Sequence, residues 1–366
     1  MGPTEPRVTI EDVAARAGVS ATAVSFVLNE RSGVGTVARS RIRKAMAELK
    51  WSPSARGRAL ASRKAFAIGL VLSRPAILLS SDLFFARFIA GVESVLSQRG
   101  YSLMLRVVGE DAQAEVEGYQ WLAAQGRVDG FLLLDLRVED PRFALLERLA
   151  VPALAVGLPA GRCPYPWLAI DDRPPMRRLV EHLVGLGHRH IAHVTGRAGF
   201  VHTASRRAAW RAVLEEAGLP PGPEQTGDFT AYGGAAATKR LLQSDALAHA
   251  IVYANDAMAL GGMQTLREAG LRVPDDVSVT GFDDVPLGAY AQPPLTTVTQ
   301  DVEAWGHAAA TGLLAALGGA SIESGRVGQA DLLLRGSTSA PPADGTRSHP
   351  IPATRPGTGP ATRGER

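Results

Sequence analysis

Short apolar segments alternate with amphipathic segments along most of the chain, and this alternation restricts its fold more than any other feature. Four strand-length apolar segments come first, FAIGLVL, YSLMLRV, DGFLLLD and VPALAV, with helical periodicity between them over 84–99, 111–125 and 141–149. The pattern then repeats with HIAHVTG, AIVYAND and VSVTGFDD and with helical segments over 203–217, 257–269 and 301–317. Strands that alternate with helices predict parallel sheets with helices on both faces. Seven or more strands in about 275 residues fit two sheets better than one, so we expect a core of two α/β subdomains.

The first fifty residues have a different pattern, which is typical of three short helices. Thr9 followed by Asp12 is a variant of the capping box that begins a helix. Gly18 permits the left-handed backbone of a tight turn, and Ser20 can cap the next helix. The expected helices are residues 10–17, 21–28 and 37–49. We therefore expect a small all-α helix-turn-helix domain at residues 8–50.

Two segments without clear periodicity flank the expected α/β core. Residues 51–64 begin with Trp51-Ser52-Pro53 and continue as a basic, alanine-rich stretch with Gly57 in its middle, which predicts a hinge. Residues 341–366 are rich in Pro, Gly, Thr and Arg, a composition typical of a disordered tail. The core is then expected at residues 65–340.

The net charge of +3 conceals an uneven distribution along the chain. Residues 1–64 carry a net charge of +7, from twelve Lys and Arg against five acidic residues, whereas residues 65–340 carry −6. A basic module beside an acidic one indicates a polyanionic partner for the basic module, because neutralised phosphates release counterions. A basic surface that only faces solvent is the alternative.

The cysteine content and the apolar segments predict the compartment. Cys163 is the one cysteine, so an intramolecular disulfide is impossible, and the first thirty residues hold no apolar run of the kind found in a signal peptide. No stretch approaches the roughly 18 consecutive apolar residues of a membrane span. We expect a cytoplasmic protein that does not associate with membranes.

Residues 9–29, TIEDVAARAGVSATAVSFVLN, have the spacing of a DNA-binding helix-turn-helix. The apolar residues of the second helix point inward in this pattern, and Ser20, Thr22 and Ser25 point outward. Small hydroxyl side chains on that face can hydrogen-bond phosphates or base edges in the major groove. A plain helical hairpin is the alternative, but the basic charge and the hinge that follows favour DNA binding.

The same stretch resembles the DNA-binding head of the lac repressor/galactose repressor (LacI/GalR) family of bacterial transcription regulators, whose pattern is T-x-x-D-V-A-x-x-A-G-V-S-x-x-T-V-S-x-x-L-N. The resemblance continues to about residue 340 and implies a two-subdomain core like that of the periplasmic binding proteins. It also implies DNA contacts from Thr9, Ser20, Ala21, Thr22, Ser25, Phe26 and Asn29. Ala21, Ala23 and Phe26 depart from the family pattern among the residues that select bases. Phe26 cannot make the paired contact of arginine to guanine, although it can touch a thymine methyl, so the operator half-site cannot be copied from a relative.

The hinge also resembles the family pattern. The stretch ARGRALAS is similar to the segment that forms a short helix when two subunits meet on DNA and inserts a leucine into the minor groove. Leu60 matches that leucine, and Arg56 and Arg58 can neutralise nearby phosphates. The resemblance therefore implies that these three residues contact the DNA.

A small-ligand site between the two subdomains is implied as well. DLFFARFIAGVE places two phenylalanines at the cleft, where rings can stack on a sugar or a purine, although core packing is the alternative. TASRRAAWRAVLEEAG supplies a ligand-binding arginine, and AIVYAND and VSVTGFDD supply Asn and Asp at the carboxyl ends of strands, where they suit vicinal hydroxyls. A capped strand-to-helix turn is the alternative for these strand ends. The implied ligand-binding residues are Phe84, Phe85, Arg206, Phe229, Asn255 and Asp283.

Several other patterns do not support a catalytic, metal or cofactor site. His188, His190 and His193 are close in sequence but have no cysteine or carboxylate at zinc spacing. The glycines at 196 and 199 lack the full dinucleotide fingerprint, and the chain has no G-x-S-x-G nucleophile elbow. We expect no catalytic residue, no metal and no cofactor, and hence no enzymatic activity.

These features predict a sequence-specific transcriptional regulator that binds a pseudo-palindromic DNA operator as a homodimer. They favour a repressor over an activator. A small-molecule effector, usually a sugar in this family, would act through its different affinity for two arrangements of the core. Three alternatives stay open. They are a corepressor-type regulator that responds to a purine or another effector, a ligand-binding receptor with a non-functional head, and an α/β enzyme fused to a DNA-binding head.

Overall fold

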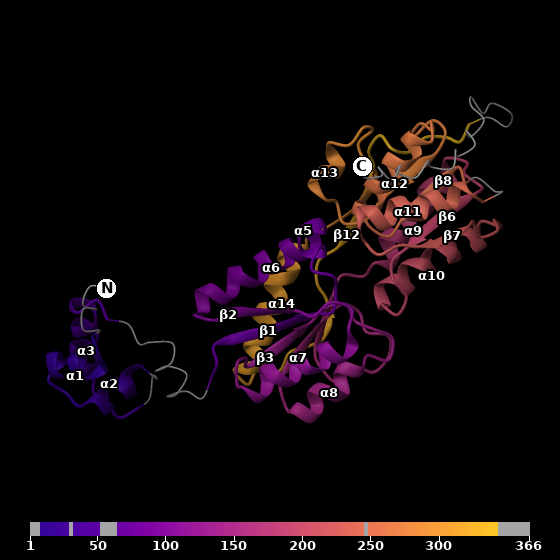
Figure 1. Cartoon of the computed structure of the whole chain (residues 1–366). Helices are drawn as coiled ribbons and strands as arrows, with labels where there is room; N and C mark the ends of the chain where they lie inside the picture. Colours follow the sequence, from indigo (N-terminus) through magenta and orange to yellow (C-terminus); the bar gives the residue numbers. More distant parts are fainter. Residues whose placement is uncertain (1–7, 29–31, 52–63, 245–247, 343–366) are drawn as a thin grey trace, which may run out of the picture.

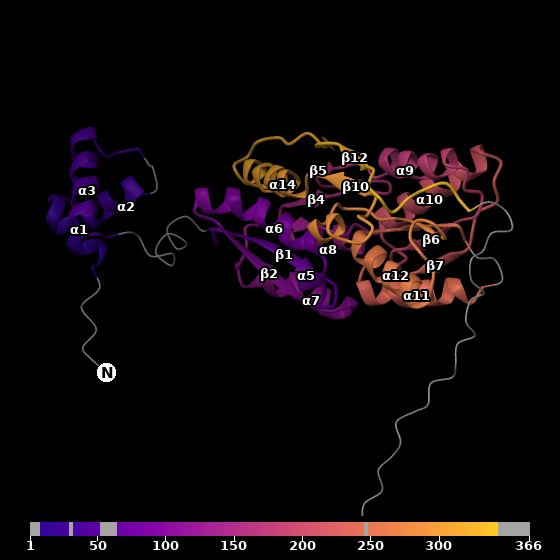
Figure 2. The same cartoon turned by 90° about the horizontal axis from the view of Figure 1, so that it is seen from above.

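The computed structural model describes residues 8–28, 32–51, 64–244 and 248–342 (Figures 1 and 2). Asn29, most of the expected hinge with Arg56, Arg58 and Leu60, and nearly all of the expected tail lie outside these residues. Within the described ranges, no helix is both long enough and apolar enough to cross a membrane.

Three helices form the small N-terminal domain, as the sequence predicts. They are α1 (Ile10–Ala17), α2 (Ala21–Leu28) and α3 (Thr36–Glu48). The predicted capping box is confirmed, since the Thr9 hydroxyl accepts the Asp12 N–H while the Thr9 N–H donates to the Asp12 carboxylate at 2.8 Å. Gly18 ends α1 with a φ of 62°. The fully buried side chains of Val13, Val24 and Ile42 hold the three helices together.

The first part of the core, here called subdomain 1, is a parallel sheet with helices on both faces. Its strand order is β11-β5-β4-β3-β1-β2. The strands are β1 (Ala67–Leu72), β2 (Ser102–Val107), β3 (Gly130–Leu133), β4 (Ala153–Val156), β5 (Trp167–Ala169) and β11 (Gly325–Arg326). The helices are α5 (Leu78–Ser81), α6 (Leu83–Leu96), the 3-10 turn Ser97–Arg99, α7 (Ala112–Ala124), α8 (Pro141–Leu149) and α14 (Val302–Leu317). In Figure 1, α6 and α14 lie on one side of the sheet and α7 and α8 on the other.

Subdomain 2 repeats this architecture with a four-stranded parallel sheet in the order β7-β6-β8-β9. The strands are β6 (Ile191–Thr195), β7 (Glu224–Thr226), β8 (Ala250–Tyr253) and β9 (Ser278–Thr280). The helices are α9 (Arg173–Gly185), α10 (Val201–Glu216), α11 (Ala231–Leu242), α12 (Asp256–Glu268) and α13 (Pro286–Ala289). An antiparallel pair, β10 (Thr297–Gln300) with β12 (Ala330–Leu333), completes it. The two predicted parallel sheets are thus confirmed.

The chain passes between the subdomains three times. It leaves subdomain 1 after β5, returns between β10 and α14, and leaves again between β11 and β12. Each subdomain is therefore built from segments that are distant in sequence. The carboxyl ends of β1 and β3 face the region between the subdomains, as do those of β6 and β8, which is where parallel sheets place their ligands.

Glycines permit a close contact between helices α6 and α14 of subdomain 1. A Cβ atom on Gly91 of α6 would lie 2.8 Å from the carbonyl carbon of Glu303 and 3.0 Å from the backbone nitrogen of His307, both in α14. A Cβ on Gly306 of α14 would lie 3.1 Å from the backbone nitrogen of Val92 in α6. The two helices therefore pack backbone against backbone.

Candidate functional site

Helix α2 and the residue before it carry the polar side chains that the sequence predicts for DNA contact. Val24 and Val27 are buried in the head, whereas Thr22 is exposed. Ser20 lies just before α2, and its hydroxyl accepts the Ala23 N–H at 3.2 Å, so this residue caps the helix. The geometry leaves the Thr22 hydroxyl at the surface, where a groove of DNA can reach it.

Several of the other predicted contact residues lie around the same helix. Ala21, Ser25 and Phe26 are half-buried, and Thr9 is exposed at the start of α1. The Phe26 ring lies beside the loop that leads to α3, since a Cβ on Gly33 would be 3.6 Å from it. Phe26 therefore packs partly against its own domain, with the rest of the ring at the surface.

The basic charge of the head is displayed mainly by α3. Arg41, Arg43 and Lys44 are exposed on this helix, and Lys44 pairs only distantly with Glu48, at 3.9 Å. Arg16 of α1 pairs with Glu48 at 2.6 Å. Exposed cations of this kind attract phosphates over a range set by the salt concentration.

A cavity of about 110 Å³ lies between subdomains 1 and 2. Its wall includes five aspartates, two arginines and several aromatic rings, and both subdomains contribute to it. Among the lining residues are Arg74, Asp82, Phe84, Phe85, Asp135, Asp171, Asp172, His202, Arg206, Phe229, Asp283, Gln300 and Trp305. The structure thus brings together five of the six predicted ligand-binding residues, from segments up to about 200 residues apart.

Arg206 is held rigidly at one side of this cavity. Its Nε donates to Asp172 Oδ2 at 2.8 Å and its Nη1 donates to the Ala254 carbonyl oxygen at 2.6 Å. The guanidinium lies 3.7 Å from the centre of the Phe282 ring. Because only 7% of Arg206 is exposed, these partners fix the direction of its remaining donors.

Two buried carboxyl groups of the cavity lack a close cation. Asp283 Oδ1 accepts Gln300 Nε2 at 2.7 Å but lies 3.9 Å from Arg206 Nη2, and burial raises its pKa well above the ordinary value. Asp82 caps α6 by accepting the Phe84 N–H at 3.0 Å, and burial raises its pKa to about 6. Both groups can accept hydrogen bonds from ligand hydroxyls.

Arg74 and Asp135 form an ion pair at the opposite side. Arg74 Nε and Nη2 donate to the two carboxylate oxygens of Asp135 at 2.8 and 2.9 Å. Burial alone would raise the pKa of Asp135, but the Arg74 charge lowers it to about 2. Arg74 is 4% exposed, and its Nη1 has no hydrogen-bond partner within the residues that the structure describes.

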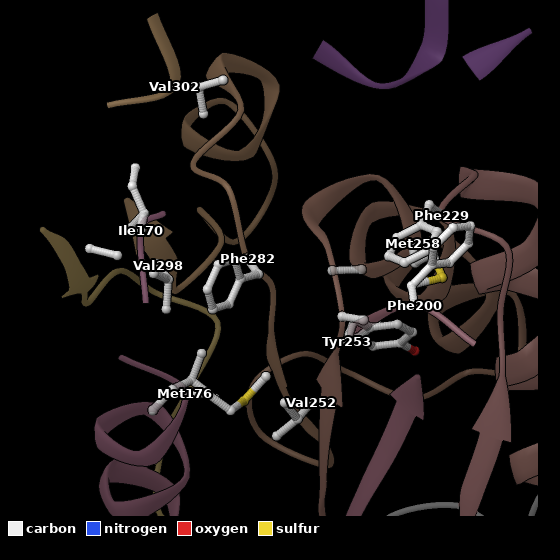
Figure 3. Close-up of a cluster of buried hydrophobic side chains, with 14 of the residues drawn as sticks. Ile170, Met176, Phe200, Phe229, Val252, Tyr253, Met258, Phe282, Val298 and Val302 are labelled. Carbon is white, nitrogen blue, oxygen red and sulfur yellow. The ribbon is translucent and has the colours of Figure 1, made fainter. Parts of the chain in front are cut away.

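Aromatic rings form part of the apolar wall of the cavity, beside several aliphatic side chains. The Phe84 and Trp305 rings meet edge to face with centroids 6.1 Å apart, and Trp305 Nε1 donates to the Leu168 carbonyl oxygen at 3.0 Å. In subdomain 2, Phe229 and Phe200 lie together beside Met258 and above Tyr253 (Figure 3). Ring faces beside a few charged and polar groups are usual components of small-molecule sites.

Asn255, the sixth predicted ligand residue, does not line the cavity. Its Oδ1 accepts the Met258 N–H at 3.0 Å, which caps α12, and its Nδ2 donates to the Phe229 carbonyl oxygen at 3.0 Å. The capped strand-to-helix turn that the sequence left open is therefore what the structure contains. Asn255 contributes to the cavity by holding the backbone of Phe229, whose φ is 70°.

The neighbouring Asp256 is fully buried and should make stability depend on pH. Burial raises its pKa to about 7, although the Thr297 hydroxyl and the Val285 N–H both donate to the carboxylate. The folded chain therefore keeps a proton that an unfolded chain releases near the ordinary pKa of 3.8. This contribution to stability is complete below pH 3.8 and is lost as the pH rises through about 7.

Asp256→Asn is expected to raise the free energy of unfolding by about 1 to 3 kcal/mol at pH 8, because no buried charge forms. The gain should shrink towards zero near pH 4. Denaturant unfolding from pH 4 to 8 measures this difference, and Asp275→Asn, at an exposed ion pair with Arg272, is the control without such a trend. A gain that is equal at every pH would contradict the assignment to Asp256.

Many of the cavity residues that the sequence does not predict are polar groups at strand ends or helix starts. Those with polar side chains or a large ring are Arg74, Asp82, Asp135, Asp171, Asp172, His202, Ser205, Gln300 and Trp305, and the others are aliphatic residues and one glycine. Arg74 and Asp135 follow β1 and β3, which are neighbours in the sheet. Ligands bind beyond the carboxyl ends of parallel strands, so the positions of this pair after two strands could have indicated a site. Applying that rule requires the order of the strands in the sheet, which the sequence does not show.

The head and the core each match the model of a protein family. Residues 9–54 match the bacterial regulatory proteins of the lacI family, and residues 180–338 match the periplasmic binding protein-like domain. The sequence is 34% identical over 325 residues to the HTH-type transcriptional regulator CelR of Thermobifida fusca, covering 88% of this chain and 95% of the relative. The solved lac repressor dimer bound to operator and the anti-inducer ONPF aligns over 92% of this chain and 100% of that chain, with 32% identity and a TM-score of 0.79. The complex of CelR with cellobiose aligns over 90% and 100%, with 33% identity and a TM-score of 0.69.

Proposed function

The chain belongs to the lacI family of bacterial regulatory proteins, which bind DNA, and on this premise we propose that it is a repressor of transcription controlled by a sugar. It would bind a pseudo-palindromic operator as a homodimer, with α2 of each head in the major groove. The observation that carries the proposal is the presence, in one chain, of the helix-turn-helix head and of the polar cavity between two subdomains. Its relatives are transcriptional regulators rather than enzymes.

The chemistry of the cavity supports a polyhydroxylated effector. Buried carboxylates accept hydrogen bonds from hydroxyls, the arginines donate to ring and hydroxyl oxygens, and Phe84, Phe229 and Trp305 offer apolar faces. The relative CelR was solved with cellobiose. We propose that Phe84, Phe85, Arg206, Phe229 and Asp283 contact the effector and that Asn255 positions Phe229.

The surface of the core supports self-association. β2 is an end strand of its sheet, and the unpaired backbone groups of an edge strand can pair with a strand of another chain. Large apolar or aromatic side chains are also exposed on several helices of the core. They include Ile77 beside α5, Tyr232 on α11 and Tyr290 at α13, and the two tyrosines are each 83% exposed. The lac repressor structure to which the chain is similar is a dimer on its operator. A two-fold dimer would also give the operator its two half-sites.

Selection of bound sequences from a random DNA library with the full chain, at moderate salt, tests the function. Val24→Asp is the control, because a carboxylate at this fully buried position disrupts the head and leaves the core intact. We expect one inverted repeat from the native chain and none from the variant. Failure to recover a repeat, either alone or with sugars and purines added in turn, would refute the proposal.

Thr22 should select one base of each half-site. Thr22→Val keeps the shape of the side chain but removes its hydroxyl, so we expect the preference at one position of the repeat to relax. The affinity for the native repeat should fall about 5- to 150-fold, as for the loss of one contact to a base. Ser40→Ala, at an exposed position of α3, is the matched control. An unchanged preference with Thr22→Val would exclude this contact.

A further inference from the structure

The charges on the wall of the cavity do not balance. Five aspartates and two arginines line it, and three of the aspartates have an arginine within 3.1 Å. The pairs are Asp135 with Arg74, Asp171 with Arg173 and Arg326, and Asp172 with Arg206. His202 adds no charge at neutral pH, because burial lowers its pKa to about 3. The carboxyl groups that stay unbalanced are those of Asp82 and Asp283.

Asp82 and Asp283 are both buried, with 7% of each residue exposed. Within the described residues, the one ion pair of Asp283 is with Arg206 Nη2 at 3.9 Å, and Arg206 has a closer partner in Asp172. No Lys, Arg or His in this part of the chain pairs with Asp82, which accepts the Phe84 N–H. Buried carboxylates without a close counter-charge are unfavourable. This part of the cavity therefore favours a ligand that brings a positive charge.

The two carboxyl groups lie close enough to interact. Asp82 begins α6, and Arg87 of the same helix donates to the carbonyl oxygens of Asp283 and Gln300 at 3.4 and 3.3 Å. These bonds hold the start of α6 beside both residues. Burial raises the pKa of Asp283 most, and the charge of Asp82 raises it further. Asp82, Asp283 and Gln300 thus belong to one part of the wall.

Gln300 adds a third acceptor to this part of the wall. Its Nε2 donates to Asp283 Oδ1 at 2.7 Å, and only 3% of the residue is exposed. Its Oε1 is buried and accepts no hydrogen bond from the residues that the structure describes. Two carboxylates and an amide oxygen require donors. A protonated amino group supplies three N–H donors and a positive charge, whereas a hydroxyl supplies one donor and no charge.

The opposite side of the cavity suits the oxygens of a sugar. Arg74 is 4% exposed, and its Nη1 is the donor already noted to have no partner in the described residues. A hydroxyl or ring oxygen can accept from it. A negatively charged group fits poorly, because Asp135 already neutralises Arg74 and a further negative charge would add to those of Asp82 and Asp283.

We propose that the effector is an amino sugar. Its protonated amino group binds Asp82, Asp283 and the amide oxygen of Gln300, and its hydroxyls face Arg74 and Arg206. The inference rests on the proposed function, because it names the class of ligand for the same cavity.

Isothermal titration calorimetry of the native full chain, without DNA, compares matched ligands at neutral pH. The ligands are glucose, galactose and mannose, their 2-amino-2-deoxy forms, the N-acetylated forms of those amines, and the matching uronic acids. We expect one amino sugar to bind at least about tenfold tighter than its parent sugar and its N-acetylated form, and no uronic acid to bind. The N-acetylated form keeps the nitrogen but removes the charge.

The outcomes separate this inference from the proposed function. A parent sugar that binds as tightly as its amino form, or tighter, would overturn the inference and leave control by a sugar intact. A uronic acid that binds best would overturn it as well. If no ligand of the panel binds, the inference is wrong for these sugars and control by a sugar loses its support, whereas the selection of an operator is unaffected.

Asp82→Asn tests the position of the amino group. Asparagine is an equally good cap, so it can still accept the Phe84 N–H after the charge is lost. We expect the affinity for the amino sugar to fall at least about tenfold and the affinity for its parent sugar to change less than about twofold. Asp111→Asn makes the same change at the exposed cap of α7 and should leave both affinities unchanged. Equal losses for both sugars in Asp82→Asn would overturn the proposed position, and the ligand comparison on the native chain decides the ligand class even if the variant does not fold.

Discussion

Gly91→Ala is expected to lower the free energy of unfolding by about 3 kcal/mol, because the added methyl group would overlap the backbone of the neighbouring helix. The atoms that it meets are the carbonyl group of Glu303 and the backbone nitrogen of His307 in α14. Backbone atoms of a helix cannot rotate away as a side chain can. The overlap is relieved only if α6 and α14 move apart, which would open the apolar layer between these helices and the sheet.

Denaturant unfolding of the native chain, Gly91→Ala and Gly185→Ala measures this effect. Gly185 lies at the end of α9, where no described atom lies within 4 Å of the position that a Cβ would take. Gly185→Ala should therefore raise stability slightly, by about 0.5 kcal/mol, through the better helix propensity of alanine. A loss below 0.5 kcal/mol in Gly91→Ala would mean that the helix crossing is looser than described.

Arg206→Met should have a comparable or larger effect, a loss of about 3 to 5 kcal/mol at pH 8. The substitution leaves the half-buried Asp172 without its close cation, Asp283 without its nearest positive charge and the Ala254 carbonyl oxygen without a donor. The loss should become smaller in acid, because Asp283, whose pKa burial raises well above the ordinary value, can then take up a proton in the folded chain. Any sugar that raises the melting temperature of the native chain should lose most of that effect in the variant.

Two variants test the cause of this loss. Arg207→Met removes the adjacent arginine, whose side chain is 47% exposed and pairs with Glu224, and should change stability by less than about 0.5 kcal/mol. Adding Asp172→Asn to Arg206→Met should restore part of the stability, since one uncompensated charge is removed. If the double variant is no more stable than Arg206→Met, the stability is lost through packing. The Asp172 carboxylate without a positively charged partner would then not be its cause.

The elements that the sequence predicts well are those whose local signals agree with their packing. The capping box of α1 and the apolar run of β1 are examples. The sequence patterns do not predict helices α9 and α11. α9 opens with Pro174 and Pro175, which a helix accepts only in its first turn, and α11 contains Gly233 and Gly234, which weaken its helical signal. A Cβ on Gly234 would meet the backbone of Met258, so the contact with α12 requires a residue that local propensity disfavours.

The sequence predicts a residue of the candidate site only where that residue lies in a recognisable local motif. Arg206 and Asp283 could be placed from the family resemblance, and both line the cavity. Arg74 and Trp305 could not, because their positions depend on the strand order and on the crossing of α6 with α14. Asn255 shows why a pattern can also mislead. An asparagine after a strand can cap the next helix or contact a ligand, and the sequence is the same in both cases. Only its hydrogen-bond partners in the structure distinguish the two roles.

The repeated passage of the chain between the subdomains has a consequence for its biosynthesis. The head can fold as soon as residues 9–51 have left the ribosome, because its contacts are local. Subdomain 1 cannot, because α14 is made about 200 residues after α6, a delay of roughly 10 to 40 s at ordinary elongation rates. During that interval the nascent chain carries a finished DNA-binding head on a sheet with one apolar face that only α6 covers. A nonsense codon near residue 300 would leave the polypeptide permanently in that state, dependent on chaperones and liable to aggregate.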